Sequence, residues 1–358
     1  MRIAGAASAF PKYYYPQKFL LEQLQEYWGD RLDNPQLLAR LHRNVTVEGR
    51  YLAIPTERYY DIKTWGQAND IWIKVAQELG EQALCRALNV AGISTKDLGA
   101  LFFTTVTGIA SPSIDALLIN HMGLPENIRR TPIFGLGCVA GAAGIARAAD
   151  YVQAYRKQAA ALVSVELCSL TLQREDLSVA NLISSGLFAD GAAAAIVIGD
   201  EFTSEVPSSD SEPRGPEILA TRSIFYPGTE EMMGWNISEK GFKIVLSTDV
   251  PNLIREKLGG DVDVFLADHG YRRSDLKTWV LHTGGPKILE ASAAALGLNN
   301  GELNASWECL RKVGNLSSAS VLVVLEDVMR NRRPELGTLG LLAAMGPGFC
   351  SELVLLRW

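Results

Sequence analysis

The sequence lacks several features that would assign it to a specialised class of protein. Five cysteines occur in 358 residues, without CxxC spacing: Cys85, Cys138, Cys168, Cys309 and Cys350. An odd, dispersed set argues against a disulfide framework or a metal site such as zinc, and it favours a reducing compartment. No apolar run approaches the roughly 20 residues that cross a bilayer, and one Arg before Pro11 is too little basic charge for a secretory signal. We expect a cytoplasmic protein with no membrane span.

An excess of positive charge is absent as well. Lys and Arg number 34 against 40 Asp and Glu, so the formal net charge is −6. Proteins that bind nucleic acid usually carry a basic stripe or patch, and we therefore expect no nucleic-acid partner. Any anionic ligand must be held by a local group of basic residues. Hydrophobic residues make up 47% of the chain, enough for a sizeable core.

Strand-like and helix-like segments alternate along the chain. Apolar residues recur every three or four positions in residues 20–43 and 65–90, which predicts amphipathic helices. Continuous runs rich in β-forming residues predict buried strands. These runs are residues 2–7, 100–106, 160–165, 192–198, 217–223, 278–281, 339–343 and 352–356. The last two flank a Gly-Pro-Gly turn, which predicts a C-terminal hairpin.

One segment, residues 204–216, is polar and dense in Ser and Pro, which predicts a surface loop and a boundary. On each side of it a buried strand leads into a Gly-rich turn and then an Ala-rich helix. We therefore expect two similar α/β halves, residues 1–210 and 211–358, packed together.

Cys138 has the sequence context of a nucleophile. A strand-like TPIFGL leads through Gly137 to Cys138, and small residues then open an Ala-rich helix. The free N–H groups and positive dipole at the first turn of a helix favour a thiolate. A buried free Cys usually only fills space, but the strand–Gly–Cys–helix context makes that interpretation the weaker one.

Two further segments offer polar partners. His282 ends a predicted strand before the Gly284–Gly285 turn, and it either faces a substrate or caps that turn. The other histidines, His42, His121 and His269, have no comparable frame, and we expect them at the surface. Asn315 follows Gly314 and precedes an apolar helix; it could donate its amide to an oxyanion or serve as a helix N-cap. The residues by themselves leave both alternatives open for Asn315.

Three segments, GLGCVAG (135–141), LHTGGPKILE (281–290) and VGNLSSAS (313–320), together resemble the catalytic motifs of type III polyketide synthases in the thiolase superfamily. Chalcone and stilbene synthases and bacterial pyrone and resorcinol synthases belong to that family. LFADGAAA (187–194) and GPGF (346–349) extend the similarity over nearly the whole chain. The resemblance implies a homodimeric α/β thiolase fold with two αβαβα halves and a five-layered core.

The resemblance also implies roles for single residues. Cys138 would take the starter acyl group from an acyl-CoA. His282 would hold Cys138 as thiolate and, with Asn315, bind the thioester oxygen of malonyl-CoA. Decarboxylation leaves an enolate, and two neutral donors stabilise that oxygen without protonating the carbanion. The carbanion then attacks the acyl-Cys thioester. No metal and no organic cofactor is implied, because the substrate thioesters and Cys138 supply the chemistry.

Other positions would border the substrates. Phe188 matches an aromatic gatekeeper, and Ile244 stands where plant enzymes carry a second gatekeeping Phe. Ser111 stands where those enzymes use a Met that reaches into the partner subunit's cavity. Small cavity-lining positions are Thr107, Cys168 and Thr171, and the GPGF segment adds Gly346 and Pro347. For coenzyme A the matching basic residues are Arg40 and Arg43, although a solvated helix face explains them equally well.

Small lining residues open a tunnel in bacterial alkylpyrone synthases. We therefore expect alkylpyrones or alkylresorcinols, made from a medium- or long-chain acyl-CoA and malonyl-CoA. One alternative is a malonyl-CoA-primed synthase of small aromatics, of the tetrahydroxynaphthalene type, against which Ile244 and the small residues count. Others are a single-condensation ketoacyl synthase III-like enzyme and a non-catalytic scaffold. Retention of all three catalytic residue types argues against the scaffold.

Overall fold

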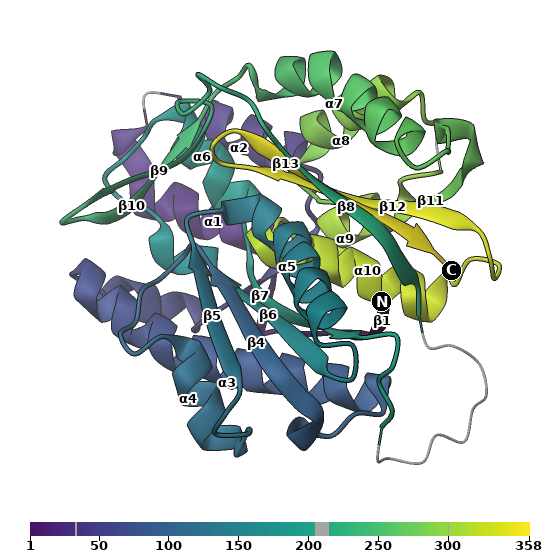
Figure 1. Ribbon diagram of the computed structural model, residues 1–358. Helices are drawn as coiled ribbons and strands as arrows, with labels where there is room; N and C mark the ends of the chain where they lie inside the picture. Colours follow the sequence, from purple (N-terminus) through teal and green to yellow (C-terminus); the bar gives the residue numbers. More distant parts are fainter. Residues whose placement is uncertain (33, 205–214, 300) are drawn as a thin grey trace.

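The computed structural model describes residues 1–32, 34–204, 215–299 and 301–358 (Figure 1). The strands are β1 (Arg2–Ala9), β2 (Tyr13–Pro16), β3 (Gly49–Leu52), β4 (Leu98–Thr105), β5 (Arg129–Phe134), β6 (Ala159–Leu167), β7 (Asp190–Ile198), β8 (Glu217–Phe225), β9 (Met233–Ser238), β10 (Gly241–Leu246), β11 (Leu276–Leu281), β12 (Leu339–Gly346) and β13 (Cys350–Arg357). All eight predicted strand segments are confirmed, including the C-terminal hairpin of β12 and β13.

The α-helices are α1 (Gln17–Trp28), α2 (Pro35–Asn44), α3 (Trp65–Ala91), α4 (Ile114–Met122), α5 (Ala140–Ala154), α6 (Val179–Leu187), α7 (Val250–Ala267), α8 (Pro286–Leu296), α9 (Asn304–Val313) and α10 (Ser320–Asn331). Short 3-10 turns are η1 (Gly29–Arg31), η2 (Thr56–Asp61), η3 (Thr95–Asp97), η4 (Gly137–Val139), η5 (Cys168–Thr171), η6 (Arg273–Asp275) and η7 (Ser317–Ala319). Among the described residues, no helix is long and apolar enough to cross a membrane.

The helix predicted over residues 20–43 is two helices, so its continuity is wrong. Gly29 leaves the helical region at φ 44° and ends α1. Asn34 then caps α2 by accepting from the N–H groups of Gln36 and Leu37, and Pro35 occupies the first helical position. The predicted boundary loop and the division at 210/211 fall on residues 205–214, which lie outside the described residues.

The main strands repeat one pairing pattern. In the described chain they form a nine-stranded sheet in the order β11-β12-β13-β8-β1-β7-β6-β4-β5. In the first half β1, β7 and β6 pair antiparallel and β4 lies parallel to β6. In the second half β8, β13 and β12 pair antiparallel and β11 lies parallel to β12. The halves join where β1 meets β8 at the single pair Arg2–Glu217.

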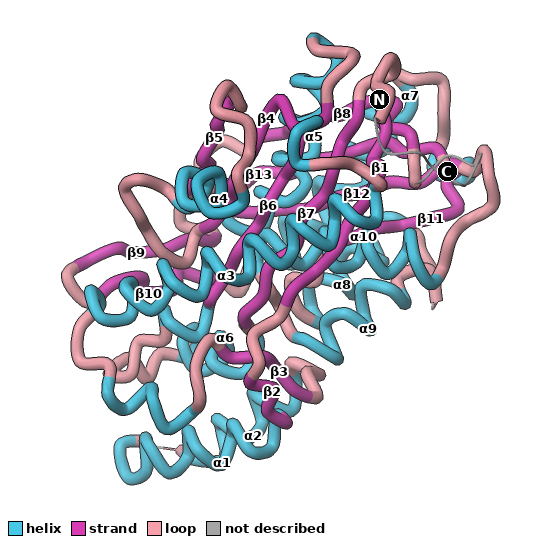
Figure 2. The backbone as a smooth tube through the Cα atoms, turned by 90° about the horizontal axis from the view of Figure 1, so that it is seen from below, coloured by secondary structure: helices cyan, strands magenta, loops and turns pink. Residues whose placement is uncertain are grey.

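Helices cover both halves and also fill the space between them. Helices α3 and α4 pack on the outer face of the first half, and α7 and α8 pack on the outer face of the second. Helices α5 and α10 lie in the middle, and their apolar residues share one core with strands of both halves (Figures 1 and 2). The result is the five-layered thiolase fold predicted from the sequence.

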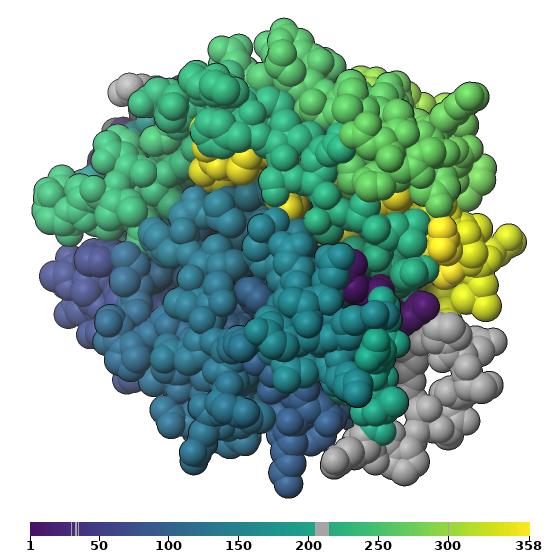
Figure 3. All heavy atoms as spheres, in the orientation of Figure 1, coloured from purple at the N-terminus to yellow at the C-terminus, as the bar shows by residue number. Residues whose placement is uncertain are grey.

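The surface view shows how closely the halves fit. The blue and teal first half meets the green second half across one face, and the yellow C-terminal strands emerge only in parts (Figure 3). The apolar side chains of β12 and β13 are mostly buried, as Leu341, Leu353 and Leu355 illustrate. The middle layer therefore lies deep in the molecule, and groups at its helix ends are largely shielded from water.

Candidate active site

Cys138 lies where the first half enters the middle layer. Strand β5 leads through Gly135 and Gly137, both with positive φ, into η4 and then α5. Gly137 at φ 55° makes the tight turn without the steric cost of a side chain. This geometry places Cys138 at the start of a 15-residue helix, buried, with 6% of its surface exposed. The predicted strand–turn–helix context of Cys138 is confirmed.

The second half supplies a matching turn. Just as η4 opens α5, η7 opens α10, and the two turns touch at the centre of the molecule. A β-carbon on Gly141 would lie 2.2 Å from the carbonyl oxygen of Ser318. The Sγ of Cys138 lies 3.6 Å from the hydroxyl of Ser317. Only small residues permit this approach, which brings Cys138 within reach of the second half.

Asn315 is tied to the same place through Ser317. The N–H of Ser317 donates to the Oδ1 of Asn315 at 2.7 Å, and the hydroxyl of Ser320 donates to the same oxygen at 3.4 Å. The side-chain nitrogen makes no hydrogen bond within the described residues. The N-cap interpretation of Asn315 is wrong, because the N-cap residue of η7 is Leu316 and that of α10 is Ala319. The Asn315 oxygen instead accepts from the first N–H of η7, and its amide N–H groups stay available to a ligand.

His282 follows directly on β11, as predicted. Its backbone N–H donates to the carbonyl of Ala343 on β12. Both ring nitrogens are buried and have no hydrogen-bond partner within the described residues. Burial lowers the pKa of His282 to about 4, so the imidazole is neutral at physiological pH. A buried polar ring of this kind can hydrogen-bond to a ligand or to an ordered water.

The sequence context predicts that Cys138 is a thiolate, but the structure favours the protonated thiol. Burial raises the pKa of the Cys138 thiol to about 12, and the nearby Glu166 also raises it, while the hydrogen bond with Ser317 acts in the opposite direction. Burial is the largest of these effects. The thiol and the imidazole of His282 are both neutral, and no hydrogen bond joins them among the described residues. Charge separation would require the thiol proton to move to an acceptor as the sulfur reacts.

Glu166 forms a buried network behind the cysteine. Its carboxylate accepts from the hydroxyl of Thr107 at 2.9 Å and from the N–H of Val106 at 3.0 Å. Its other oxygen accepts from the hydroxyl of Ser318. Burial raises the pKa of Glu166 to about 7. The Thr107 hydroxyl also accepts from the N–H of Leu167, so Thr107 is committed to this network.

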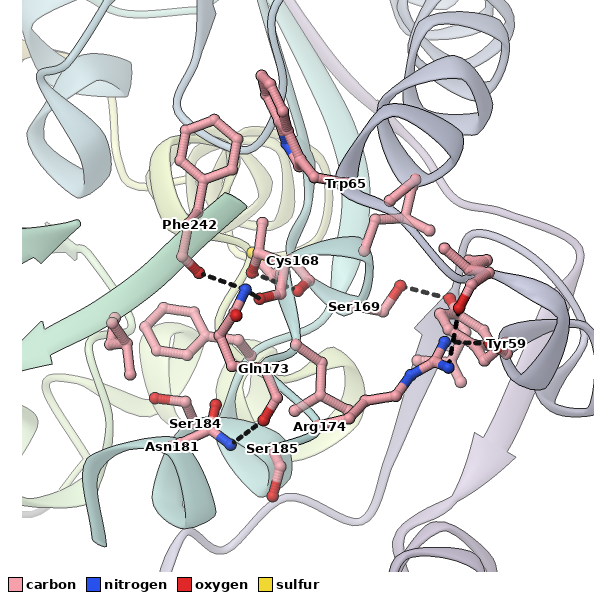
Figure 4. A pocket seen from close by; sticks show the side chains of 18 of the residues that line it. Tyr59, Trp65, Cys168, Ser169, Gln173, Arg174, Asn181, Ser184, Ser185 and Phe242 are labelled. Atoms are coloured by element: carbon pink, nitrogen blue, oxygen red, sulfur yellow. Dashed lines mark hydrogen bonds between the residues drawn. The ribbon is translucent and has the colours of Figure 1, made fainter. Parts of the chain in front are cut away.

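A cavity of about 610 Å³ is bordered by Cys168 and the residues that follow it in η5. Of the predicted lining residues, Phe188, Ile244, Cys168 and Thr171 border it. Figure 4 shows Trp65 and Phe242 on one side and Asn181, Ser184 and Ser185 on the opposite side. Its volume suits a drug-sized or smaller ligand. Cys138, His282 and Asn315 do not line this cavity. Phe188 borders it and forms a parallel bridge with Asn315.

Four predicted lining residues lie elsewhere. Gly346 and Pro347 support the nucleophile turn, because β-carbons on Gly346 and Gly137 would collide with Val139 and Pro347 respectively. Thr107 faces Glu166, and Ser111 is exposed in the loop before α4. None of these four residues borders the cavity described above, and their place along the substrate path stays a prediction.

The predicted coenzyme A residues, Arg40 and Arg43, lie exposed on α2. Neither forms an ion pair within the described residues. His42 between them is buried, so its predicted surface position is wrong. Its Nε2 contacts the hydroxyl of Ser185 at 3.1 Å, and burial lowers the pKa of His42 to about 3. The other two histidines are exposed, as predicted.

Several residues of the site were not predicted. Arg50 and Ser184 line the cavity, and the Ser184 hydroxyl is buried without a hydrogen-bond partner. Trp235 and Phe242 meet edge to face at 6.0 Å across the β9–β10 hairpin. Ser317 could have been noticed, since it stands inside the VGNLSSAS motif. Arg50 carries no local signal, because its neighbours in space come from distant parts of the sequence.

The fold and the buried Cys, His and Asn residues define a class, the acyltransferases with a thiolase fold. Family models for chalcone and stilbene synthases match the chain, the N-terminal domain over residues 11–201 and the C-terminal domain over residues 217–358. The chain belongs to the chalcone and stilbene synthase family and is a type III polyketide synthase, which uses CoA thioesters as substrates.

Relatives and solved structures support this assignment. The chain is 46% identical to a 1,3,6,8-tetrahydroxynaphthalene synthase of Streptomyces peucetius subsp. caesius, covering 99% of this chain and 93% of the relative. It is 33% identical to a putative chalcone synthase of Bacillus subtilis, covering 99% and 98%. The crystal structure of the tetrahydroxynaphthalene synthase of Streptomyces coelicolor A3(2), a bacterial type III polyketide synthase, matches with a TM-score of 0.93 at 30% identity, covering 100% of this chain and 99% of that one.

Proposed function

We propose that the chain is a malonyl-CoA-primed synthase of a small hydroxylated aromatic, of the tetrahydroxynaphthalene type. The 46% identity to a synthase of that name, over almost the full length of both chains, carries the proposal. It favours the alternative that the sequence analysis ranked second over the alkylpyrone and alkylresorcinol hypothesis. The number of malonyl-CoA molecules follows from the product. A naphthalene skeleton has ten carbons, and each decarboxylated malonyl unit supplies two, so five malonyl-CoA molecules are required.

The cavity supports the same conclusion. Hydroxyl and amide side chains border it, among them Ser169, Thr171, Gln173, Asn181 and Ser184. A poly-β-ketone carries a carbonyl at every second carbon. The Ser184 hydroxyl, which is buried without a hydrogen-bond partner among the described residues, can donate to such a carbonyl, whereas a long alkyl chain would leave it unsatisfied. Its aromatic walls at Trp65, Trp235 and Phe242 suit a flat ring.

We infer that Cys138 is the nucleophile. Its sulfur attacks the thioester carbonyl of the starter, while its proton moves to the neutral imidazole of His282. The coenzyme A thiolate then leaves and takes that proton. The charged sulfur and imidazolium would stabilise each other in the desolvated site. Acyl-Cys138 is therefore formed from two groups that are neutral before and after the step.

Each extension begins with malonyl-CoA. Its carboxylate leaves as CO2, and the bonding electron pair passes into an enolate whose oxygen accepts hydrogen bonds from His282 and the Asn315 amide. The enolate carbon attacks the carbonyl of acyl-Cys138, and the sulfur leaves. The lengthened chain, now on coenzyme A, returns to Cys138 for the next round. Phe188 lies between the Asn315 bridge and the cavity, so we assign it the gate between them.

Three further roles belong to this proposal. The exposed Arg40 and Arg43 would bind the phosphates of coenzyme A. Strand β5 lies at the open edge of the sheet, with Ile109 and Ser111 exposed beside it, and would pair with a second copy in a homodimer. All five cysteines are free, and we place the protein in the cytoplasm, where thiols stay reduced.

The decisive experiment incubates the purified chain with labelled malonyl-CoA alone. We expect an aromatic product built entirely from malonyl carbons, identified by mass spectrometry. Product formation only after addition of hexanoyl-CoA or palmitoyl-CoA would overturn malonyl priming. Cys138→Ala should lose acyl-enzyme formation and all condensation, and full condensation by that variant would refute the nucleophile assignment.

The second candidate remains a synthase that uses long acyl-CoA starters. Cys168 and Ile244 are modest in size and line the cavity, and the apolar Leu20 and Leu24 of α1 extend its wall. If long starters are used, Cys168→Phe should shorten the longest starter accepted. If Cys168→Phe uses hexanoyl-CoA and palmitoyl-CoA at the same rates as the parent does, the tunnel hypothesis is wrong.

A further inference from the structure

Arg50, on β3, is a buried cation at the cavity wall. Its side chain and backbone together are 4% exposed, and no carboxylate forms an ion pair with it among the described residues. Burial lowers the pKa of Arg50 to about 10, with Asp190 acting in the opposite direction, so the guanidinium stays charged at neutral pH. An unpaired buried charge is costly. The guanidinium of Arg50 must therefore make contacts that offset this cost.

The contacts of Arg50 point to one backbone segment. The guanidinium donates through Nη1 to the carbonyl of Phe188 at 2.6 Å and through Nε to the Oε1 of Gln17 at 3.1 Å. Gln17 in turn donates its amide to the carbonyl of Gly186 at 2.8 Å. Gln17 and Arg50 therefore hold two alternate carbonyls, 186 and 188, on one edge of the segment 186–189, beside β3 (Figure 2).

The other edge of the same segment pairs with Asn315. The N–H of Asn315 donates to the carbonyl of Leu187, and its carbonyl accepts from the N–H of Ala189, both at 2.9 Å. A β-carbon on Gly314 would lie 2.9 Å from the Leu187 carbonyl oxygen and 3.3 Å from the Cδ of Arg50. Any shift of residues 186–189 must therefore move the backbone of Asn315.

We propose that Arg50, with Gln17, is a positioning residue that fixes residues 186–189 and through them the Asn315 amide and the ring of Phe188. The proposal rests on the proposed role of Asn315 at the enolate oxygen. Arg50 touches no reacting atom in this scheme. It acts on decarboxylation, where the amide must meet the developing oxyanion within a few tenths of an ångström, and much less on acylation of Cys138.

The test separates these two steps. Decarboxylation of malonyl-CoA to acetyl-CoA is measured in a Cys138→Ala background, and acyl transfer from malonyl-CoA to the sulfur is followed by intact-protein mass spectrometry with Cys138 present. We expect Arg50→Met to lower kcat for decarboxylation at least tenfold, with KM and the acylation rate changed no more than about threefold. Arg50→Lys, which keeps charge and one donor, should restore part of the loss.

Two further variants keep the result interpretable. Gln17→Met removes both side-chain hydrogen bonds of Gln17 at nearly constant volume. It should lower kcat for decarboxylation more than the acylation rate, by a smaller factor than Arg50→Met does. It therefore replaces Arg50→Met if that variant does not fold. Arg86→Met is the matched control, because Arg86 also donates to a backbone carbonyl, that of Ser8, away from the cavity. We expect the decarboxylation and acylation rates of Arg86→Met to equal those of the parent.

The outcomes distinguish the inference from the function beneath it. If Asn315→Ala loses decarboxylation and Arg50→Met and Gln17→Met do not, the positioning role is wrong. A proportional loss of acylation and decarboxylation, together with a lower melting temperature, would assign Arg50 a structural role and also overturn the proposal. If Asn315→Ala itself decarboxylates normally, the proposed function of Asn315 fails first.

Discussion

The environment of the His282 imidazole suggests a direct test of its proposed role. The imidazole is neutral, and its ring nitrogens have no hydrogen-bond partner among the described residues. In the proposed scheme it accepts the proton that the Cys138 thiol loses. Removing that acceptor raises the cost of making the thiolate, whose pKa burial already raises. The proposed role of His282 as base can therefore be tested through the reactivity of the sulfur, independently of any product.

We predict that His282→Gln slows alkylation of Cys138 by iodoacetamide at pH 7 roughly 10- to 100-fold. Mass spectrometry of the alkylated peptide measures the rate. The exposed Cys85 in the same samples is the internal control and should react equally in both proteins. An identical rate for Cys138 in the two proteins would contradict the assignment of His282.

At the scale of elements, the contact between α5 and η7 decides whether the two halves of the site meet. Gly141 lies on α5 where a β-carbon would meet the Ser318 carbonyl at 2.2 Å and the Cγ1 of Val321 at 2.7 Å. One of these contacts is backbone, which cannot rotate aside. A single methyl group at position 141 must therefore push η4 and η7 apart.

Gly141→Ala should destabilise the fold by about 1–3 kcal/mol through overpacking and lower condensation further than stability alone explains, because Cys138 moves away from Ser317. Denaturant unfolding and product formation give the two measurements. Gly80→Ala in α3 is the control, since its β-carbon would find ordinary contacts from 3.5 Å and Ala favours helix. Equal behaviour of the two variants would refute the close-contact argument.

At the scale of the whole molecule, burial of histidines links stability to pH. His42 has a pKa of about 3 in the folded chain and about 6.5 when unfolded, so the unfolded state binds a proton first as pH falls. Stability therefore decreases below pH 6.5, and His282 acts in the same direction. Glu166 and Asp190, with pKa values raised to about 7 and 6 by burial, act in the opposite direction.

Comparison with His42→Gln isolates one contribution from this balance. Between pH 6.5 and pH 5 a buried neutral His costs about 2 kcal/mol of unfolding free energy. The loss on acidification should thus be smaller by about that amount in the variant, measured by urea unfolding at pH 7 and pH 5. An equal loss in variant and parent would show that His42 does not stay neutral in the folded chain.

Assembly is the second property at this scale. Ile109 is 42% exposed in the loop next to the open edge at β5, and Ile109→Glu places a charge where the proposed second copy would pack. Light scattering should give a mass of two chains of 39.0 kDa for the parent and one for the variant. Val264→Glu on α7, exposed on another face, should remain dimeric. A monomeric parent would exclude the dimer.

The sequence by itself determined the strands, the repeated strand–turn–helix units and the three motifs around Cys138, His282 and Asn315. These depend on local chemistry: hydrophobic period, glycine at turns and the residue types that catalysis needs. The single helix over residues 20–43 failed for a local reason too, since the cap at Asn34 and the bend at Gly29 were overlooked.

Tertiary structure alone decided the rest. Cys138 and Ser317 meet across 179 positions, and Arg50 reaches Phe188 across 138. Such contacts leave no periodic pattern in a sequence. The sequence therefore could not predict the burial of His42, the hydrogen bond between Thr107 and Glu166, or the hydrogen bonds of Arg50 and Gln17 to residues 186–189. The pKa values of buried groups follow from desolvation, and desolvation exists only once distant segments have closed over them.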